Sequence, residues 1–345
     1  MHTDGFAPLD KHLPELGVEY QELTDRWVSA TLGWVSQILE SNPPNLGGSS
    51  TTARGLRQHA MLKLDETMHL IDAPTLAPVK EFFRRNIETA IEQIQREKMS
   101  NGATVWKLYN HGFVVKTENH CWAHDLVRGT GEMNMTDEQL GALIGEIDAL
   151  FCSHWHGDHI SSEVAKKALK EDVPVFVAPL PTGDWGEAMV ERLGSARDSD
   201  GFHILELGGS GRLATTDGAL MYHAYPGHQG ELENCVFAVS ADGMTIMQTG
   251  DQSNDDDFSW IDTVGDGRAV DVLLPNVWTN DMRRVITGVK PRAVIPGHEN
   301  ELGHSFEHRE PYDQAYEKLS ALDEAHGIDW YVLAWGERMH IDARR

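Results

Sequence analysis

The segment Ser153-His154-Trp155-His156-Gly157-Asp158-His159 directly follows the apolar run 147–152. It brings three imidazoles and a carboxylate to the end of a predicted buried strand. Imidazole suits zinc and related divalent ions, and a carboxylate extends the choice to harder metals. Because a strand sends alternate side chains to opposite faces, His154 and His156 share a metal only if the chain leaves the strand there. Gly157 would permit the sharp loop that this requires. The segment therefore predicts a metal-binding loop, with Asp158 and His159 pointing to a second position nearby.

Three more candidate ligands each follow a predicted apolar strand and a glycine. They are His228 after the strand 220–225, Asp251 after 244–249, and His298 after 293–295. Catalytic groups lie preferentially on loops held at the end of a rigid sheet. Any one of these three positions could be an ordinary capped turn. Their repetition in one domain predicts that they converge on the histidine-rich segment.

Seven residues in this order resemble the metallo-β-lactamase-fold superfamily of metal-dependent hydrolases: His154, His156, Asp158, His159, His228, Asp251 and His298. The resemblance covers roughly residue 102 to the C-terminus. It implies an α/β fold, a four-layer αββα sandwich of two mixed β-sheets flanked by helices. The site would lie at one edge of the two facing sheets.

The resemblance also implies a role for each ligand. It assigns His154, His156 and His228 to a first metal site, Asp158, His159 and His298 to a second, and Asp251 to a bridging position. Asp158 and Asp251 are the expected catalytic carboxylates, and Asp125 is similar to a buried aspartate that orients ligands. Trp335-Gly336-Glu337 resembles the branch that contains ascorbate-phosphate lactonase-like enzymes. One or two Zn²⁺ ions are the expected cofactor, with Mn²⁺ or Fe²⁺ as alternatives.

The chain divides into two predicted parts. Residues 1–101 form an N-terminal helical extension, with helices expected at 13–40, 55–71 and 76–99 from the helical spacing of apolar residues. Residues 102–345 form the hydrolase domain, where short strands occur both consecutively and separated by helices. We expect the extension to be a layer packed on the main domain or at a subunit interface, with a substrate lid as the alternative.

Composition limits the partners. A formal net charge of −25 disfavours phosphate backbones and anionic membranes. No apolar run approaches the roughly 18 residues of a transmembrane helix, and the first residues do not resemble a secretion signal. Three widely separated cysteines are not a disulfide framework, so a cytoplasmic location is expected. The expected partners are a small-molecule substrate and, through the N-terminal helices, other copies of the chain.

These observations predict a metal-dependent hydrolase that uses a metal-activated water to cleave a small ester, lactone, amide or phosphoester. A nucleic-acid phosphodiesterase of the same fold and a non-hydrolytic metal-binding or redox protein are the alternatives. The acid that protonates the leaving group stays open among His223, His304 and His308. Further expectations concern residues outside the ligand set: His111, His120 and His124 are supporting or surface residues, 255–257 is a solvated loop, and 208–211 is a turn.

Overall fold

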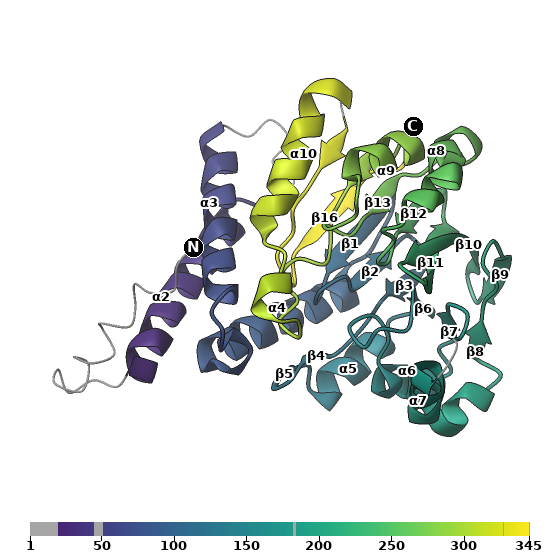
Figure 1. The fold of residues 1–345 in the computed structure, drawn as a ribbon, viewed down its shortest axis with the longest axis horizontal. Helices are drawn as coiled ribbons and strands as arrows, with labels where there is room; N and C mark the ends of the chain where they lie inside the picture. The colour runs from purple at the N-terminus through teal and green to yellow at the C-terminus, as the bar shows by residue number, and fades with distance from the viewer. Residues whose placement is uncertain (1–19, 45–50, 182–183, 327, 345) are drawn as a thin grey trace.

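The computed structural model describes residues 20–44, 51–181, 184–326 and 328–344. Two seven-stranded sheets form its centre (Figure 1). The first has the order β16-β1-β2-β3-β6-β7-β8, and the second has the order β15-β14-β13-β12-β11-β10-β9. The strands of the first sheet are β1 (Ala103–Lys107), β2 (Phe113–Lys116), β3 (Cys121–His124), β6 (Ala149–Cys152), β7 (Val175–Val177), β8 (Phe202–Ile204) and β16 (Arg338–Ile341). Those of the second are β9 (Ser210–Thr215), β10 (Gly218–Gln229), β11 (Leu232–Ala241), β12 (Met244–Gln248), β13 (Val272–Leu274), β14 (Ala293–Val294) and β15 (Asp329–Trp330).

Both sheets are mixed. In the first, β3, β6, β7 and β8 run parallel, whereas β16, β1, β2 and β3 pair antiparallel. In the second, β12 to β15 are parallel and β9 to β12 antiparallel. A short ribbon of β4 (Gly129–Thr130) and β5 (Met133–Asn134) stands apart. Parallel strands need crossover connections, and helices supply them.

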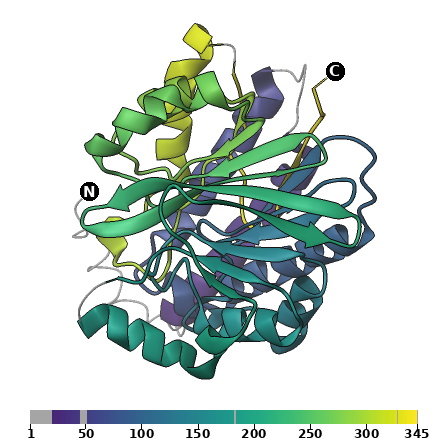
Figure 2. The same cartoon turned by 90° about the vertical axis from the view of Figure 1, so that its right-hand side faces the viewer.

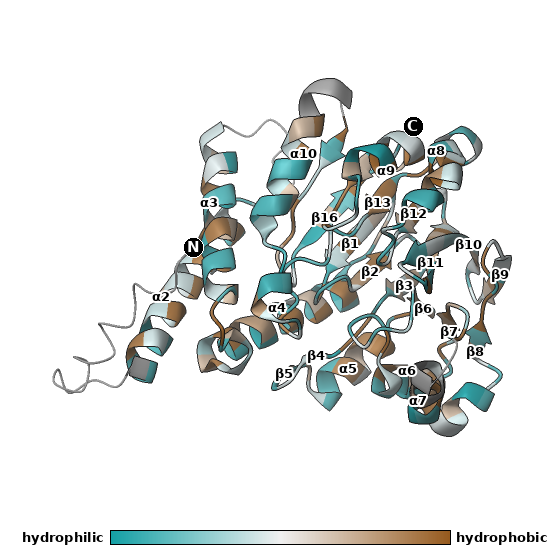
Figure 3. Cartoon of the chain, in the orientation of Figure 1, coloured by the Kyte–Doolittle hydropathy of each residue, from teal (hydrophilic) through white to brown (hydrophobic). Residues whose placement is uncertain are grey.

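Helices cover the outer faces of the two sheets (Figure 2). They are α2 (Tyr20–Ser41), α3 (Thr51–Met68), α4 (Ala77–Arg96), α5 (Asp137–Ile144), α6 (Ser162–Lys170), α7 (Asp184–Leu193), α8 (Phe258–Gly267), α9 (Met282–Val289) and α10 (Tyr312–His326). Figure 3 shows hydrophobic residues along β12 and β13 and hydrophilic residues on α9 and α10. The expected αββα sandwich is confirmed.

The core lies between the sheets. Phe151 of β6 contacts Phe237 of β11 with ring centroids 5.2 Å apart, which joins the first sheet to the second. All four residues of β6 are buried, because parallel strands covered on both faces carry continuous apolar runs. This burial holds the chain rigid up to Cys152, where the histidine-rich segment begins.

The three predicted N-terminal helices are present, with α3 beginning at Thr51 rather than at 55 and ending at Met68 rather than at 71. Helix α4 buries its expected apolar stripe, which includes Phe82, Ile87 and Ile94. Helix α2 packs on α3 and α4, and α3 packs on α10. Residues 13–19 and 45–50, for which a helix start and a loop are predicted, lie outside the described residues. Among the described helices, none has the length and apolar character to cross a bilayer.

Two local predictions were wrong. Strand β10 continues past Tyr225 to Gln229 and includes His228, which we expected in a turn; His228 pairs with Glu233 of β11. The turn expected at 208–211 is present only at its start, with a turn at 207–208, whereas β9 begins at Ser210. Strand pairing explains both differences: β10 pairs with β11 at His228 and with β9 at Ser210, and such pairing overrides local turn propensity.

Candidate metal centre

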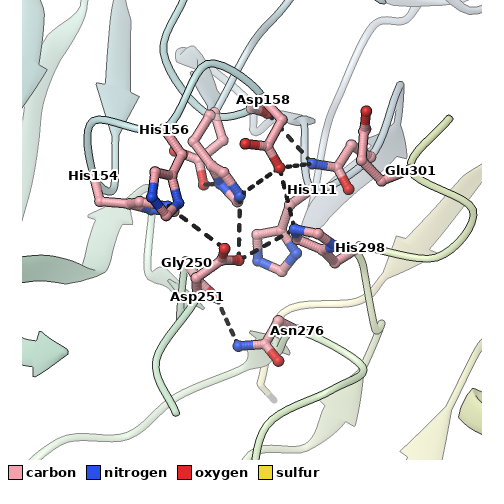
Figure 4. Close-up of polar contacts among 12 residues, drawn as sticks. His111, His154, His156, Asp158, Gly250, Asp251, Asn276, His298 and Glu301 are labelled. Atoms are coloured by element: carbon pink, nitrogen blue, oxygen red, sulfur yellow. Dashed lines mark hydrogen bonds and ion pairs between the residues drawn. The ribbon is translucent and has the colours of Figure 1, made fainter. Parts of the chain in front are cut away.

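The loops that follow β6, β12 and β14 meet at one edge of the sandwich and bring six of the seven predicted ligands together (Figure 4). His154 Nε2 lies 3.1 Å from His156 Nδ1 and 3.5 Å from Asp251 Oδ2. The other carboxylate oxygen, Asp251 Oδ1, lies 3.2 Å from His159 Nε2 and 3.4 Å from His298 Nε2. Asp251 therefore faces two groups of histidines with its two oxygens.

Asp158 completes the second group. Its Oδ2 lies 3.3 Å from His159 Nε2 and 3.3 Å from His298 Nε2. The described residues thus contain two three-residue clusters of metal-ligand type that share His159. One cluster is His154, His159 and Asp251, and the other is Asp158, His159 and His298.

Backbone geometry aims these side chains. Gly250 has φ +53°, and a Cβ there would lie 2.2 Å from Asn234 Oδ1 and 2.5 Å from Ser153. Only glycine fits this turn, which directs Asp251 into the site. Gly157 differs from expectation: its φ lies outside the left-handed region, and nothing approaches a Cβ there within 4 Å. The sharp loop after β6 does not require glycine at that position.

Asp125 supports the histidine-rich segment from beneath. It accepts hydrogen bonds from the Ser153 amide at 2.6 Å and the Ser153 hydroxyl at 2.8 Å. Its Oδ2 also lies 2.9 Å from His159 Nδ1. All three residues are buried. The expected orienting role of Asp125 follows from these contacts, because a carboxylate on Nδ1 leaves Nε2 free to bind a metal.

The donor set fits a divalent cation. Three buried atoms that converge, His159 Nε2, Asp251 Oδ1 and His298 Nε2, have no hydrogen-bond partner among the described residues. Buried polar atoms are normally satisfied, so unpartnered atoms at one point indicate a missing ligand. Two imidazoles and a carboxylate are the donors that zinc, manganese and iron bind in proteins.

The pKa values of the site residues also indicate that the site binds a cation. Burial opposes ionisation of Asp251, but His159 and His298 outweigh it and hold the pKa of Asp251 well below its usual value. Burial likewise opposes protonation of His298, yet Asp251 and Asp158 raise its pKa to about 10. Without a metal, the buried carboxylates therefore keep protons on neighbouring imidazoles. Burial lowers the pKa of His154 to about 3, so this imidazole is neutral and ready to bind.

The turn between β1 and β2 contributes residues that the sequence analysis did not assign to the site. Asn110 Nδ2 donates to Asp158 Oδ2 at 3.0 Å, and the Asn110 carbonyl accepts from the His298 amide at 3.2 Å. The fully buried ring of His111 lies 6.0 Å from that of His159 and 6.3 Å from that of His298. The sequence does contain a sign of this contribution, because the polar pair Asn110-His111 lies between the apolar residues of β1 and β2.

His228 stands outside both clusters. Its Nδ1 lies 2.7 Å from Asp257 Oδ1, and its backbone amide donates to the other oxygen of that carboxylate at 2.9 Å. Asp257 is buried, so the expectation that the whole 255–257 run is solvated was wrong; Asp255 and Asp256 are exposed. Because Asp257 contacts Nδ1 of His228, Nε2 is the ring nitrogen of His228 that could bind a metal. That His228 is a metal ligand stays a prediction.

A cavity of about 350 Å³ adjoins the second cluster. Its lining residues are Gln229, Trp278, His298, His304, Ser305, His308 and Glu310. His304 Nε2 lies 3.8 Å from Asp158 Oδ2, and its Nδ1 lies 3.3 Å from the His308 carbonyl. Two of the three histidines considered as proton donors therefore border the site.

The remaining histidines have partners elsewhere. His223 Nδ1 lies 2.5 Å from the Ser210 hydroxyl, and His120 lies between Asp242 and Thr215. His124 accepts a hydrogen bond from the Trp122 indole at 3.0 Å. Each of these three rings therefore has a hydrogen-bond partner away from the metal centre.

Similarity to known proteins is confined to structure. No protein-family model matches the chain, and no curated protein sequence matches it. Igni18, a metallo hydrolase from Ignicoccus hospitalis, is similar with a TM-score of 0.52 and 17% identity, covering 70% of this chain and 99% of its own. CmlA, a diiron β-hydroxylase from Streptomyces venezuelae, has a TM-score of 0.50 and 13% identity over 71% of this chain; the match spans 55% of CmlA. YhfI from Bacillus subtilis, a metallo-β-lactamase fold protein, has a TM-score of 0.48 and 11% identity, covering 70% of this chain and all of YhfI.

The fold and the position of the ligand loops define the class. Two facing mixed sheets with outer helices and a His/Asp cluster at one edge are the metallo-β-lactamase fold. The similarity to Igni18 and CmlA, at 17% and 13% identity, supports the fold alone and leaves the reaction to the residues of the site.

Proposed function

We propose that this protein is a metal-dependent hydrolase that cleaves a small-molecule substrate with a metal-activated water. One observation carries the proposal. Asp251 presents Oδ2 to His154 at 3.5 Å and Oδ1 to His159 and His298 at 3.2 and 3.4 Å. A carboxylate with a separate histidine group on each oxygen is suited to bridging two ions.

The ligands would divide between two sites. His154, His156 and His228 would hold a first ion, Asp158, His159 and His298 a second, with Asp251 shared. A bound divalent ion lowers the pKa of water and polarises a carbonyl or phosphoryl oxygen. Asp158 Oδ2 lies 3.8 Å from Nε2 of His304, which lines the cavity, and Asp158 is our proposed proton acceptor when the second site is empty. Zn²⁺ is the proposed ion, because nitrogen donors dominate the set.

The cavity favours an uncharged substrate. Its volume of about 350 Å³ suits a small molecule. Its described lining contains Glu310 and no lysine or arginine, so a phosphate group would find no permanent cation there other than the metal. Together with the net charge of −25, this supports a neutral ester, lactone or amide over a phosphoester or a nucleic acid.

An iron-dependent oxidation is the second candidate. The same histidine and carboxylate donors bind iron. The structural similarity to CmlA, a diiron β-hydroxylase, supports this alternative. Metal content separates the two, because hydrolysis is expected with zinc or manganese and oxidation requires iron and an oxidant.

Two further proposals concern the whole molecule. All three cysteines are buried and free, which supports a cytoplasmic location. Leu23 and Trp27 on α2 and Leu56 on α3 are exposed, which supports self-association through the N-terminal helices. Light scattering after gel filtration tests the second proposal: a monomer at all concentrations contradicts it.

Elemental analysis of the purified protein, coupled to a substrate panel, tests the proposed function. The panel contains aryl esters, lactones, amides and a bis-aryl phosphodiester, each with added Zn²⁺ or Mn²⁺. We expect bound metal and turnover of a neutral substrate, and at least about a hundredfold loss of kcat/KM in Asp251→Asn. The exposed Asp256 provides the matched control, Asp256→Asn, with unchanged turnover. A wild-type protein that binds no metal would overturn the proposal.

A further inference from the structure

We propose that Asp65 of helix α3 is a positioning residue for the metal centre, which makes the N-terminal extension a working part of the site. The inference rests on the proposed metal-binding function. It concerns the segment from His298 to Asp313, which carries one predicted ligand and much of the cavity wall. Nothing in the local sequence around Asp65 points to this role.

Asp65 holds this segment at two places. Its buried carboxylate accepts from Asn300 Nδ2 at 2.8 Å, two residues after His298. It also accepts from the backbone amides of Tyr312 at 2.8 Å and Asp313 at 3.0 Å, at the start of α10. One side chain of the extension therefore joins the ligand loop to the first turn of a helix.

The ligand loop needs such support because its backbone is strained. His298 has φ +74° and Asn300 has φ +53°, both in the left-handed region that non-glycine residues seldom adopt. Each such residue costs conformational free energy, so surrounding contacts must hold the conformation. Between them, Glu299 is fully buried and forms an ion pair with the buried Lys107. The contacts of Glu299 and Asn300 hold the loop from two sides.

The end of α3 also holds the cavity wall. Arg309 Nη1 donates to the carbonyls of Met68 at 3.0 Å and Leu70 at 2.9 Å. His69 Nε2 lies 2.6 Å from the Arg309 carbonyl. Because His308 and Glu310 line the cavity on either side of Arg309, α3 sets the position of both.

A purely structural role for Asp65 predicts a different result. A group that only caps α10 would change stability when removed but leave the affinity of the folded protein for metal unchanged. A positioning residue changes the affinity of the second metal site, because His298 moves with the loop. Mutating a residue that orients a metal ligand lowers metal affinity or activity about 10–100-fold.

Metal titration of folded variants against a chromophoric chelator, with Zn²⁺ as the probe, tests the inference. Asp65→Asn keeps the shape of the side chain but turns an amide donor towards backbone donors. Asn300→Gly keeps the left-handed backbone and removes only the hydrogen bond to Asp65. Glu66→Gln is the matched control, since Glu66 is an exposed neighbour on α3 that pairs with Lys63.

We expect Asp65→Asn and Asn300→Gly each to weaken the binding of one Zn²⁺, that of the second site, about ten- to a hundredfold and to leave the other ion unchanged. The double variant should be no worse than Asp65→Asn alone, because Asn300→Gly removes a hydrogen bond that Asp65→Asn has already disturbed. Unchanged Zn²⁺ affinity in folded Asn300→Gly would overturn the inference, even if Asp65→Asn failed to fold. A wild-type chain that binds no Zn²⁺ would instead overturn the proposed function, so the two failures are distinguishable.

Discussion

Nδ1 of His159 lies 2.9 Å from Oδ2 of Asp125, and both side chains are fully buried. Burial opposes the ionisation of Asp125, but His159 holds the pKa of this carboxyl below its usual value. The Asp125 carboxylate therefore stays charged and keeps the proton of His159 on Nδ1. Nε2 is left as the nitrogen that faces Asp158 and Asp251.

Asp125→Asn should weaken metal binding about 10–100-fold, because the amide no longer fixes the tautomer of His159. Competition with a chelator measures the affinity. Asp148→Asn is the control, since Asp148 accepts a hydrogen bond from the backbone amide of Cys121 in the first sheet and is not one of the residues that hold the predicted ligands. Equal affinities in wild type and Asp125→Asn would contradict the orienting role.

The metal-free protein should lose stability as pH rises. The pKa of His298 is raised to about 10 from 6.5, so its contribution is complete below pH 6.5 and lost as pH approaches 10. The pKa of Asp251 is depressed below 3.8, so its contribution is present above that pH and lost in acid. Metal binding displaces the imidazole protons, and the gain in Tm from metal should therefore grow between pH 6.5 and 9. Melting curves with and without a chelator measure this gain; a gain that shrinks with pH would contradict the charge assignment.

The parts of the site that were predictable are local in sequence. The run of ligands after β6 and the glycine before Asp251 lie beside apolar strands, so strand and ligand are recognised together. His228 was misplaced because Pro226-Gly227 has turn propensity. In the structure Gly227 opposes Asn234 across the β10–β11 ribbon, and a Cβ there would lie 2.9 Å from the Asn234 side chain. That glycine permits close approach of a neighbouring strand rather than a turn.

Long-range supports were not predictable from one sequence. Asp65 contacts Asn300 across 235 positions, and Asp257 contacts His228 across 29. Neither carboxylate has a local pattern that marks its partner. Asp257 follows two exposed aspartates, yet it is buried where it contacts His228 of β10. Such contacts follow from the tertiary fold alone.

Gly250→Ala should destabilise the protein by about 2–4 kcal/mol, from the left-handed backbone and the steric clash with Asn234. Asn234 Oδ1 also accepts from the Asp251 amide at 3.0 Å, so metal affinity should fall as well. Gly157→Ala is the comparison, because its Cβ meets open space, and its stability should change by less than about 0.5 kcal/mol. Urea denaturation measures both; similar losses would show that the turn at Gly250 tolerates a side chain.

His304→Gln should lower kcat more than His308→Gln, because His304 Nε2 lies 3.8 Å from Asp158 Oδ2. If His304 protonates the leaving group, the loss is expected to be about 10²–10⁴-fold for a poor leaving group. The loss should shrink for aryl esters whose leaving phenols are more acidic. A series of such esters provides the measurement. An equal loss across the series would assign His304 to substrate binding instead.

His228→Ala should remove the first metal site, for which we propose His228 as a ligand. It should leave the second site, because the cluster Asp158, His159 and His298 does not include it. Asp257→Asn should weaken the same site by about 10–100-fold, since it orients the ring through Nδ1. Asp256→Asn is the control: Asp256 is the exposed neighbour of Asp257, and this variant should keep both metal sites. Metal stoichiometry by elemental analysis after dialysis distinguishes the outcomes. Two ions retained in His228→Ala would mean that this histidine and Asp257 form a structural pair at the rim, and that the first ion is held by His154, His156 and Asp251 without it.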